Sequence, residues 1–156
     1  MSKWNSKEWP ALCSGEACPI CLRGKPLGIV AALKATYLTS SPDSPMRGYG
    51  CLVLKRHAVE LYELDEAEAC ALMGDIQVAA RAIQHITGAV KMNYEIHGNT
   101  LPHLHVHLFP RYIGDPFEDG PVDPRQTTVS PYRPGEFEHF VEALKKDLAG
   151  FSFHPS

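Results

Sequence analysis

The sequence has little that would place the protein in a membrane or on a nucleic-acid polymer. No apolar run approaches the ~20 residues that a helix needs to cross a bilayer, and the opening residues MSKWN are polar, unlike a signal peptide. The formal net charge is -3, which gives no electrostatic basis for binding a phosphate polymer. We therefore expect a cytoplasmic protein that binds no membrane and no nucleic-acid polymer.

Disulfides are also not expected, although the chain has five cysteines. Thiols stay reduced in the cytoplasm, so a cysteine pattern there indicates a metal site, redox chemistry or core packing. With 156 residues, 44% of them hydrophobic and 21% charged, the chain has the composition of an ordinary globular domain. We expect one domain over residues 1–156, without repeats or linkers.

Local patterns predict an α+β fold. Asp65 and Glu68 resemble a capping box before a long helix that Gly88 is placed to end. A C-terminal helix is expected over about 136–148. Strand patterns occur at 29–33, 35–39, 50–54, 90–96 and 103–109. The order predicts an antiparallel sheet of about five strands that carries the long helix.

Three regions make up this predicted domain. Residues 1–27 read as an irregular arm or knuckle, because Trp, Pro, Gly and Cys residues follow one another without periodicity. Residues 28–112 form the core, and residues 113–156 form a loop followed by the last helix.

The most informative segment is the last strand. His103, His105 and His107 alternate with apolar residues, so the three imidazoles are expected to line one face while the apolar side chains face the core. A lone histidine is more often an ordinary surface or core residue. Three in strict alternation, with an apolar opposite face, point instead to a functional site.

Two kinds of chemistry suit such a row. Imidazole is a common metal ligand, but residues four apart on a strand lie ~13 Å apart, while metal–nitrogen bonds are about 2.1 Å long. All three rings can hardly bind one ion. The other chemistry is nucleophilic attack on phosphorus by a neutral imidazole, with a second histidine stabilising the phosphoryl oxygens or protonating the leaving group.

The strand and its flanks resemble the histidine triad (HIT) family, whose signature is His-x-His-x-His followed by apolar residues. NYEIHGNTLP precedes HLHVHL, and FPRY follows it. The similarity extends from about Cys18 to Pro116. It implies a nucleotidyl hydrolase that acts on dinucleoside polyphosphates or nucleoside phosphoramidates at the α-phosphate. It also implies a covalent nucleotidyl-histidine intermediate and a homodimer with sheets joined edge to edge.

The resemblance also assigns residues. The nucleophile falls on His105, and His107 would contact the phosphate and assist the leaving group. Asn93 matches an amide residue that binds near the phosphate. Asn99 and Thr100 stand where many members have Gln-Ser or Gln-Thr, which is a departure from the family pattern on the phosphate side. The family's ribose-binding residue would fall near 41 or 43, and neither position is assigned.

Cys18 and Cys21 form a CxxC pair. A redox site would need a strand before the motif, and none is predicted there. Some HIT relatives bind a structural zinc with two cysteines, a histidine at the place of His57 and the first triad histidine. The resemblance therefore implies a zinc site of Cys18, Cys21, His57 and His103, which would leave only two triad histidines for chemistry. The alternative is two unpaired cysteines in a surface arm.

Several alternatives stay open. A nucleotidyltransferase or phosphorylase would share the mechanism, although His107 favours hydrolysis because the uridylyltransferase branch has glutamine there. A nucleotide- or metal-binding module without catalysis is a second alternative, and a metal-dependent oxygenase is a third.

For four other residues the sequence predicts a core position or leaves the role open. Cys51 and Cys70 are expected in the core. His97 either approaches the site or is a solvated loop residue. Arg111 either meets a phosphate or forms an exposed salt bridge.

Overall fold

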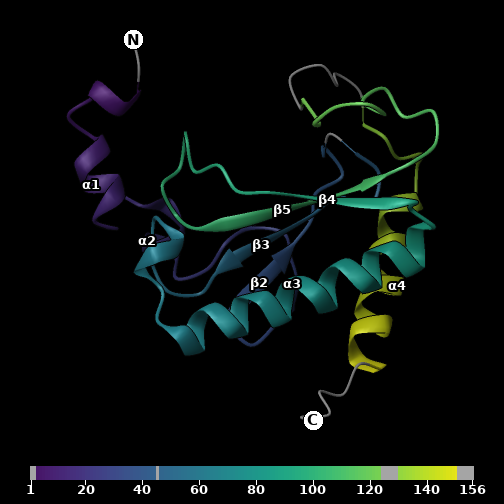
Figure 1. Cartoon of the computed structure of the whole chain (residues 1–156), viewed down its shortest axis with the longest axis horizontal. Coiled ribbons are helices and arrows are strands. Elements are labelled where there is room, and N and C mark those ends of the chain that lie inside the picture. Colours follow the sequence, from purple (N-terminus) through teal and green to yellow (C-terminus); the bar gives the residue numbers. More distant parts are fainter. Residues whose placement is uncertain (1–2, 45, 124–129, 151–156) are drawn as a thin grey trace.

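A long helix lies along one face of a five-stranded antiparallel sheet (Figure 1). The computed structural model describes residues 3–44, 46–123 and 130–150. The strands are β1 (Ile29–Ala32), β2 (Thr36–Thr39), β3 (Gly50–Leu54), β4 (Lys91–Glu95) and β5 (His105–Arg111), in the spatial order β1-β2-β3-β5-β4. This confirms the predicted α+β fold with about five strands.

Strand β5 is an interior strand, between β3 and β4. Its register pairs Val53 with His105, Cys51 with His107, and Glu95 with His107. Directly paired residues of an antiparallel sheet point to the same face. The two histidines of β5 therefore share one face with these three neighbours, and Val106 and Leu108 point to the other face.

The long helix α3 (Glu66–Thr87) has the predicted ends. Asp65 accepts from the backbone N–H of Glu68, whose side chain accepts in return from that of Asp65, and Gly88 follows with φ of 69°. Its inner side buries Leu72, Ala79, Ala80 and Ile83. They pack in one core with sheet residues that include Leu38, Leu52, Val106 and Leu108.

A buried carboxylate of α3 joins the helix to the sheet. Asp75 is fully buried and accepts hydrogen bonds from the backbone N–H groups of Lys34, Ala35 and Thr36, and from the Thr36 hydroxyl, at 2.8–3.1 Å. These donors lie in and beside the turn between β1 and β2. One helix side chain thus satisfies three backbone donors of this turn, of which the N–H of Thr36 is buried.

The expectation that residues 1–27 are irregular is wrong in part. They contain a short 3-10 helix, η1 (Lys3–Asn5), and two short helices, α1 (Trp9–Cys13) and α2 (Pro19–Arg23). Both α-helices have a proline in the first turn, where the missing N–H costs nothing. The pattern was too short to show helical periodicity. Trp4 Nε1 donates to the backbone oxygen of Asn99 at 3.0 Å, so the arm reaches the loop before β5.

The remaining elements are a short 3-10 helix, η2 (Leu61–Glu63), and the predicted C-terminal helix, α4 (Glu136–Gly150). Phe140 and Leu144 of α4 are buried against the core. Cys70 is exposed, so its assignment to the core is wrong: it lies on the solvent side of α3. Among the described residues, no helix is long and apolar enough to cross a membrane.

Candidate functional site

Two histidine rings meet on the open face of the sheet. The ring centroids of His105 and His107 lie 4.8 Å apart at an interplanar angle of 88°. Both side chains are half-buried. The pair is held on β5 between two other strands, so its position is fixed by the sheet and not by a loop.

The ring orientation of His105 is set by the backbone. Its Nδ1 lies 2.6 Å from the carbonyl oxygen of His103. A carbonyl oxygen only accepts, so Nδ1 carries the proton and donates. The neutral ring then has an unprotonated Nε2, which is the nitrogen available as a nucleophile.

His107 has a different neighbour. Its Nδ1 forms a hydrogen bond of 2.7 Å with the hydroxyl of Tyr49, and burial is the main cause that lowers the pKa of His107 to about 4, with smaller effects of His105 and His97. Burial, with Cys51 and Glu95 nearby, raises the pKa of Tyr49. At neutral pH His107 is therefore a neutral imidazole beside a protonated phenol.

A cavity of about 540 Å³ opens at this histidine pair. Its walls come from α2, the loop after β2, the beginning and middle of β3, and the residue Leu101 before β5. Most of its lining is apolar, and the polar groups include Thr39, Ser40, Ser41, His105 and His107. An apolar pocket with a few convergent polar groups is the usual form of a small-molecule site.

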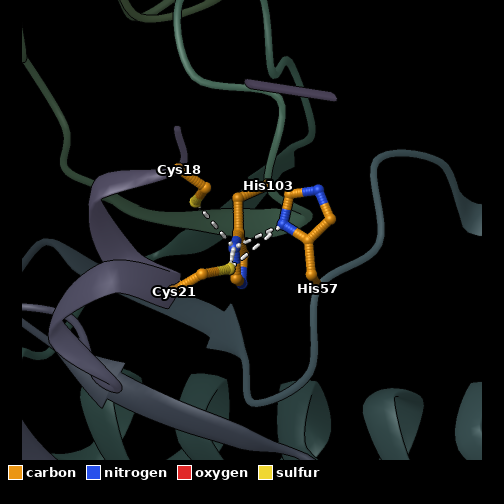
Figure 2. A group of neighbouring side chains, drawn as sticks. All are labelled: Cys18, Cys21, His57 and His103. Carbon is orange, nitrogen blue, oxygen red and sulfur yellow. Dashed lines mark hydrogen bonds between the residues drawn. The ribbon is translucent and has the colours of Figure 1, made fainter. Parts of the chain in front are cut away.

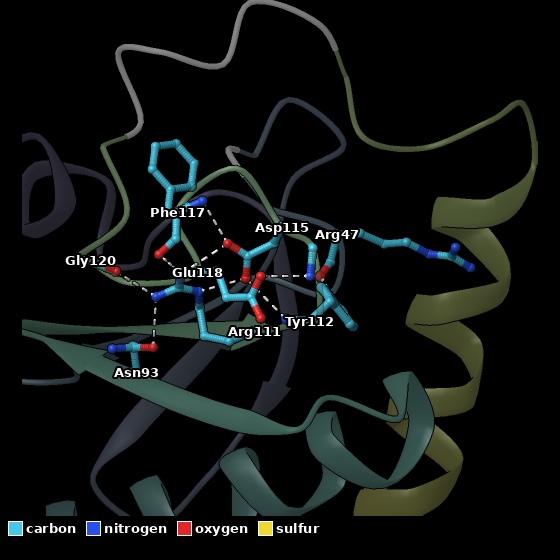
Figure 3. Close-up of polar contacts among 9 residues, drawn as sticks. Arg47, Asn93, Arg111, Tyr112, Asp115, Phe117, Glu118 and Gly120 are labelled. Atoms are coloured by element: carbon cyan, nitrogen blue, oxygen red, sulfur yellow. Dashed lines mark hydrogen bonds and ion pairs between the residues drawn. The ribbon is translucent and has the colours of Figure 1, made fainter.

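The three residues predicted to bind substrate lie in different surroundings. Asn93 accepts a hydrogen bond of 3.1 Å at Oδ1 from Nη1 of Arg111 (Figure 3). Asn99 and Thr100 are exposed in the loop between β4 and β5, and neither lines the cavity described above. Within this loop it is Leu101 that lines the cavity.

One interpretation of the sequence gave Arg111 an exposed salt bridge, but the salt bridge that it forms is buried. Arg111 is buried and makes a two-pronged ion pair with Asp115 at 2.8 and 2.9 Å, and it also donates to the carbonyl oxygens of Phe117 and Gly120 (Figure 3). The ion pair lowers the pKa of Asp115 to about 2. Arg111 therefore holds the loop after β5 and orients Asn93, and its charge is already paired.

The first triad histidine belongs to a separate cluster. Strand β5 begins at His105, two residues later than predicted, so His103 lies before the strand. Figure 2 shows it facing His57, from the loop after β3, and Cys18 and Cys21, from α2 and its N-terminal flank. The four ligand atoms lie within 4.8 Å of one another. This is the set expected for a metal site.

The contacts in this cluster converge on two imidazole nitrogens. Nδ1 of His103 lies 3.4 Å from Sγ of Cys18 and 3.7 Å from Sγ of Cys21. Nδ1 of His57 lies 3.3 Å from Sγ of Cys21 and 3.3 Å from Nδ1 of His103. Two sulfurs and two ring nitrogens thus surround one point, with Cys18 and His103 fully buried.

Backbone carbonyls hold both rings of the cluster. Nε2 of His103 lies 2.8 Å from the carbonyl oxygen of Leu54, and Nε2 of His57 lies 2.8 Å from that of Cys13. Nε2 must donate in each case, which leaves both Nδ1 atoms unprotonated and facing the thiols. Burial is the main cause that lowers the pKa of His103. Neutral imidazoles with an anchored N–H are what a metal ion requires.

Comparison with known proteins agrees with this geometry. A model of the HIT domain matches residues 29–114, more than half of the chain. The chain belongs to the HIT domain family. A search of curated proteins found no match.

Solved structures of histidine triad proteins share the fold. One from Bradyrhizobium japonicum is 29% identical with a TM-score of 0.66, covering 77% of this chain and 89% of its own. Another from Marinobacter aquaeolei VT8 is 26% identical with a TM-score of 0.65, covering 80% and 90%. A zinc-bound member from Mycobacterium smegmatis is 21% identical with a TM-score of 0.63, covering 86% and 95%, which shows likeness of fold.

Two site residues were not predicted from the HIT pattern. Tyr49 precedes β3 and reaches His107 only because β3 pairs with β5. Glu95 lies in the segment before the triad, and the family pattern implies no role for it. In the structure it pairs with His107 in register and contacts His97. Strand pairing is the signal that would have found both residues, and it is not visible in a linear pattern.

Proposed function

We propose that the protein is a nucleotidyl hydrolase that cleaves dinucleoside polyphosphates or nucleoside phosphoramidates at the α-phosphate. The observation that carries the proposal is the hydrogen bond between Nδ1 of His105 and the carbonyl oxygen of His103, at 2.6 Å. It leaves Nε2 of His105 as an unprotonated nitrogen on a rigid strand, at the wall of a cavity of about 540 Å³.

In the first step, Nε2 of His105 forms a bond to the α-phosphorus while the bond to the leaving group breaks. Charge on the phosphoryl oxygens is stabilised by hydrogen-bond donors set in place beforehand. His107 supports this role: a Tyr49 hydroxyl that donates to Nδ1 puts the ring proton on Nε2, which can then donate to a phosphoryl oxygen. The imidazole needs no charge to do so.

In the second step, water attacks the same phosphorus and releases the nucleoside monophosphate. The bond between phosphorus and Nε2 breaks, and its electron pair returns to His105. Because the reaction is divided into two displacements at the same phosphorus atom, the same arrangement of residues can act in both steps. Asn93, oriented by Arg111, and Asn99 and Thr100 are proposed as further contacts on the phosphate side.

We further propose that Cys18, Cys21, His57 and His103 bind a structural zinc ion. Bonds of about 2.3 Å to sulfur and 2.0–2.1 Å to nitrogen, at tetrahedral angles, separate neighbouring ligand atoms by about 3.3–3.8 Å. The sulfur–nitrogen and nitrogen–nitrogen contacts of 3.3–3.7 Å that Nδ1 of His57 and Nδ1 of His103 make fit this range. Bound zinc would join the N-terminal arm to the segment that leads into β5.

The zinc-bound relative from Mycobacterium smegmatis lends support to this metal. The set of two thiols and two imidazoles suits zinc better than the iron of an oxygenase, whose usual ligands are two histidines and a carboxylate with open positions. A cytoplasmic location and a homodimer stay predictions from the sequence. A nucleotidyltransferase of the same mechanism is the second candidate, and it differs only in the acceptor of the second step.

The test is intact mass spectrometry after a rapid quench without acid. Wild type and His105→Ala are mixed with a diadenosine polyphosphate or with adenosine phosphoramidate. Wild type should gain the mass of one adenylyl group, and His105→Ala should not. The substrate that gives the higher occupancy is the better one.

His85→Ala is the matched control, because His85 is exposed on α3, away from the cavity. It should form the adduct as wild type does. The absence of both adduct and product from wild type with either substrate would contradict the hydrolase. An adduct that decays only when phosphate or a sugar phosphate is added would instead identify a transferase.

A further inference from the structure

A fourth histidine stands beside the reactive pair. The ring centroid of His97 lies 5.6 Å from that of His107. His97 follows β4 by two residues, so it continues the face on which Glu95 pairs with His107. The sequence allows His97 to be either a site residue or a solvated loop residue. Its position beside His107 favours a site residue.

Glu95 orients this fourth ring. Nε2 of His97 lies 2.9 Å from Oε2 of Glu95, and half of the His97 side chain is exposed while only 16% of the Glu95 side chain is. A carboxylate only accepts, so Nε2 donates to it. Nδ1 of His97 has no hydrogen-bond partner among residues 3–44, 46–123 and 130–150 and is the atom left to exchange a proton.

Among the residues that the structure describes at this histidine pair, no other group is a good proton donor for a leaving group. The low pKa of His107, about 4 because of burial, keeps its ring neutral, and His105 uses its one ring proton on the carbonyl of His103. Burial raises the pKa of Tyr49 and raises that of Cys51 to about 11. Groups this weakly acidic release a proton poorly at neutral pH.

We propose that His97, positioned by Glu95, protonates the leaving group of the reaction proposed above. As Nε2 of His105 bonds to phosphorus, the bond to the leaving nitrogen or oxygen breaks and its electron pair stays on that atom. For this step His97 must be doubly protonated, with its Nε2–H donated to Glu95. The leaving atom takes the proton from Nδ1 of His97, and the ring becomes neutral. In the second step the attacking water gives a proton back to Nδ1, and the electron pair of the P–N bond returns to His105.

This assignment rests on the proposed function and refines its substrate class. A leaving group that is already a stable anion needs little help from an acid, whereas an amine or an alkoxide must be protonated as it departs. A histidine–carboxylate pair at the leaving-group side therefore favours nucleoside phosphoramidates, or esters of alcohols, over dinucleoside polyphosphates.

The test compares two adenosine 5′-phosphate derivatives that differ only in the leaving group. One is the p-nitrophenyl ester, whose leaving group departs as an anion, and the other is the phosphoramidate of an alkylamine. For His97→Gln, kcat/KM should fall by about 100-fold or more with the phosphoramidate and by no more than about 3-fold with the ester. For Glu95→Gln, kcat/KM should also fall more with the phosphoramidate than with the ester, but by a smaller factor than for His97→Gln.

The matched control is His85→Gln, which removes a more exposed histidine that also has a carboxylate partner, Asp147, at 3.1 Å. It should leave both rates as in wild type. Equal losses on the two substrates, or no loss on either, would overturn the role of His97 while wild type still forms the adduct. If wild type forms no adduct with the ester, the proposed function fails, and the role of His97 fails with it.

Discussion

His103 and His105 are two residues apart, yet their rings are held in opposite ways. At His103 a backbone carbonyl takes Nε2, and Nδ1 faces two thiols and another imidazole. At His105 a backbone carbonyl takes Nδ1, and Nε2 is left for the cavity. The two rings thus leave different nitrogens free, which suits His103 to the proposed metal site and His105 to the proposed role of nucleophile.

This difference shows that the spacing of histidines in the sequence places the side chains but does not determine the chemical role of each. The role depends on which ring nitrogen a backbone acceptor occupies, because that choice fixes the tautomer. The ring of His105 donates to the carbonyl oxygen of His103, so the residue proposed to hold the metal also orients the proposed nucleophile. The two sites are therefore physically connected through one residue.

The largest expected effects separate the two sites. Cys21→Ala should abolish binding of one zinc per chain and lower Tm by about 10 °C or more, because binding free energy at a structural site is folding free energy. His105→Ala should keep the zinc and lose activity by about 10⁴-fold or more. Metal analysis, thermal unfolding and turnover are measured on both variants.

Cys70→Ala is the control for the cysteine variant, because Cys70 is exposed on α3 and outside the cluster. It should keep both zinc and Tm. A Cys21→Ala protein that retains full zinc and an unchanged Tm would refute the metal site, and loss of zinc from His105→Ala would refute the separation.

A smaller effect is expected at the partner of His107. Tyr49→Phe removes the hydroxyl that bonds Nδ1 at 2.7 Å and frees the ring to change tautomer, so kcat should fall by about 10-fold, the value of one lost hydrogen bond. KM and zinc content should stay near those of wild type. Steady-state kinetics decide: an unchanged kcat means that Tyr49 does not set the orientation of His107.

The smallest effect is on stability at acid pH. The pKa of His107 is about 4 in the folded protein because of burial, against about 6.5 in an unfolded chain. Between these values the unfolded state binds a proton that the folded state does not, so stability falls as pH falls from about 6.5 towards 4. His107→Gln lacks this contribution of histidine protonation to stability, so its Tm should fall less than that of wild type between pH 7 and pH 5. Equal falls in both proteins contradict the shift.

The sequence predicted the fold well where local patterns are long. The capping box at Asp65 and the stop at Gly88 bound α3 as expected. The four residues that the resemblance to the HIT family implies as metal ligands lie together in the structure. The sequence-based prediction was wrong for Cys70, because the side of α3 on which a residue lies decides whether it is exposed. It also missed the short helices of the N-terminal arm. Tyr49, and the buried pairing of Arg111 with Asp115, depend on contacts made by the fold.

The most direct test of the opposite tautomers is long-range ¹H–¹⁵N NMR of the zinc-loaded protein labelled at histidine. We expect a protonated Nε2 and a metal-bound Nδ1 at His57 and His103, and a protonated Nδ1 with an unprotonated Nε2 at His105. A His105 ring protonated at Nε2 in the free enzyme would contradict the account, because the nitrogen assigned to attack phosphorus would then have no lone pair to use.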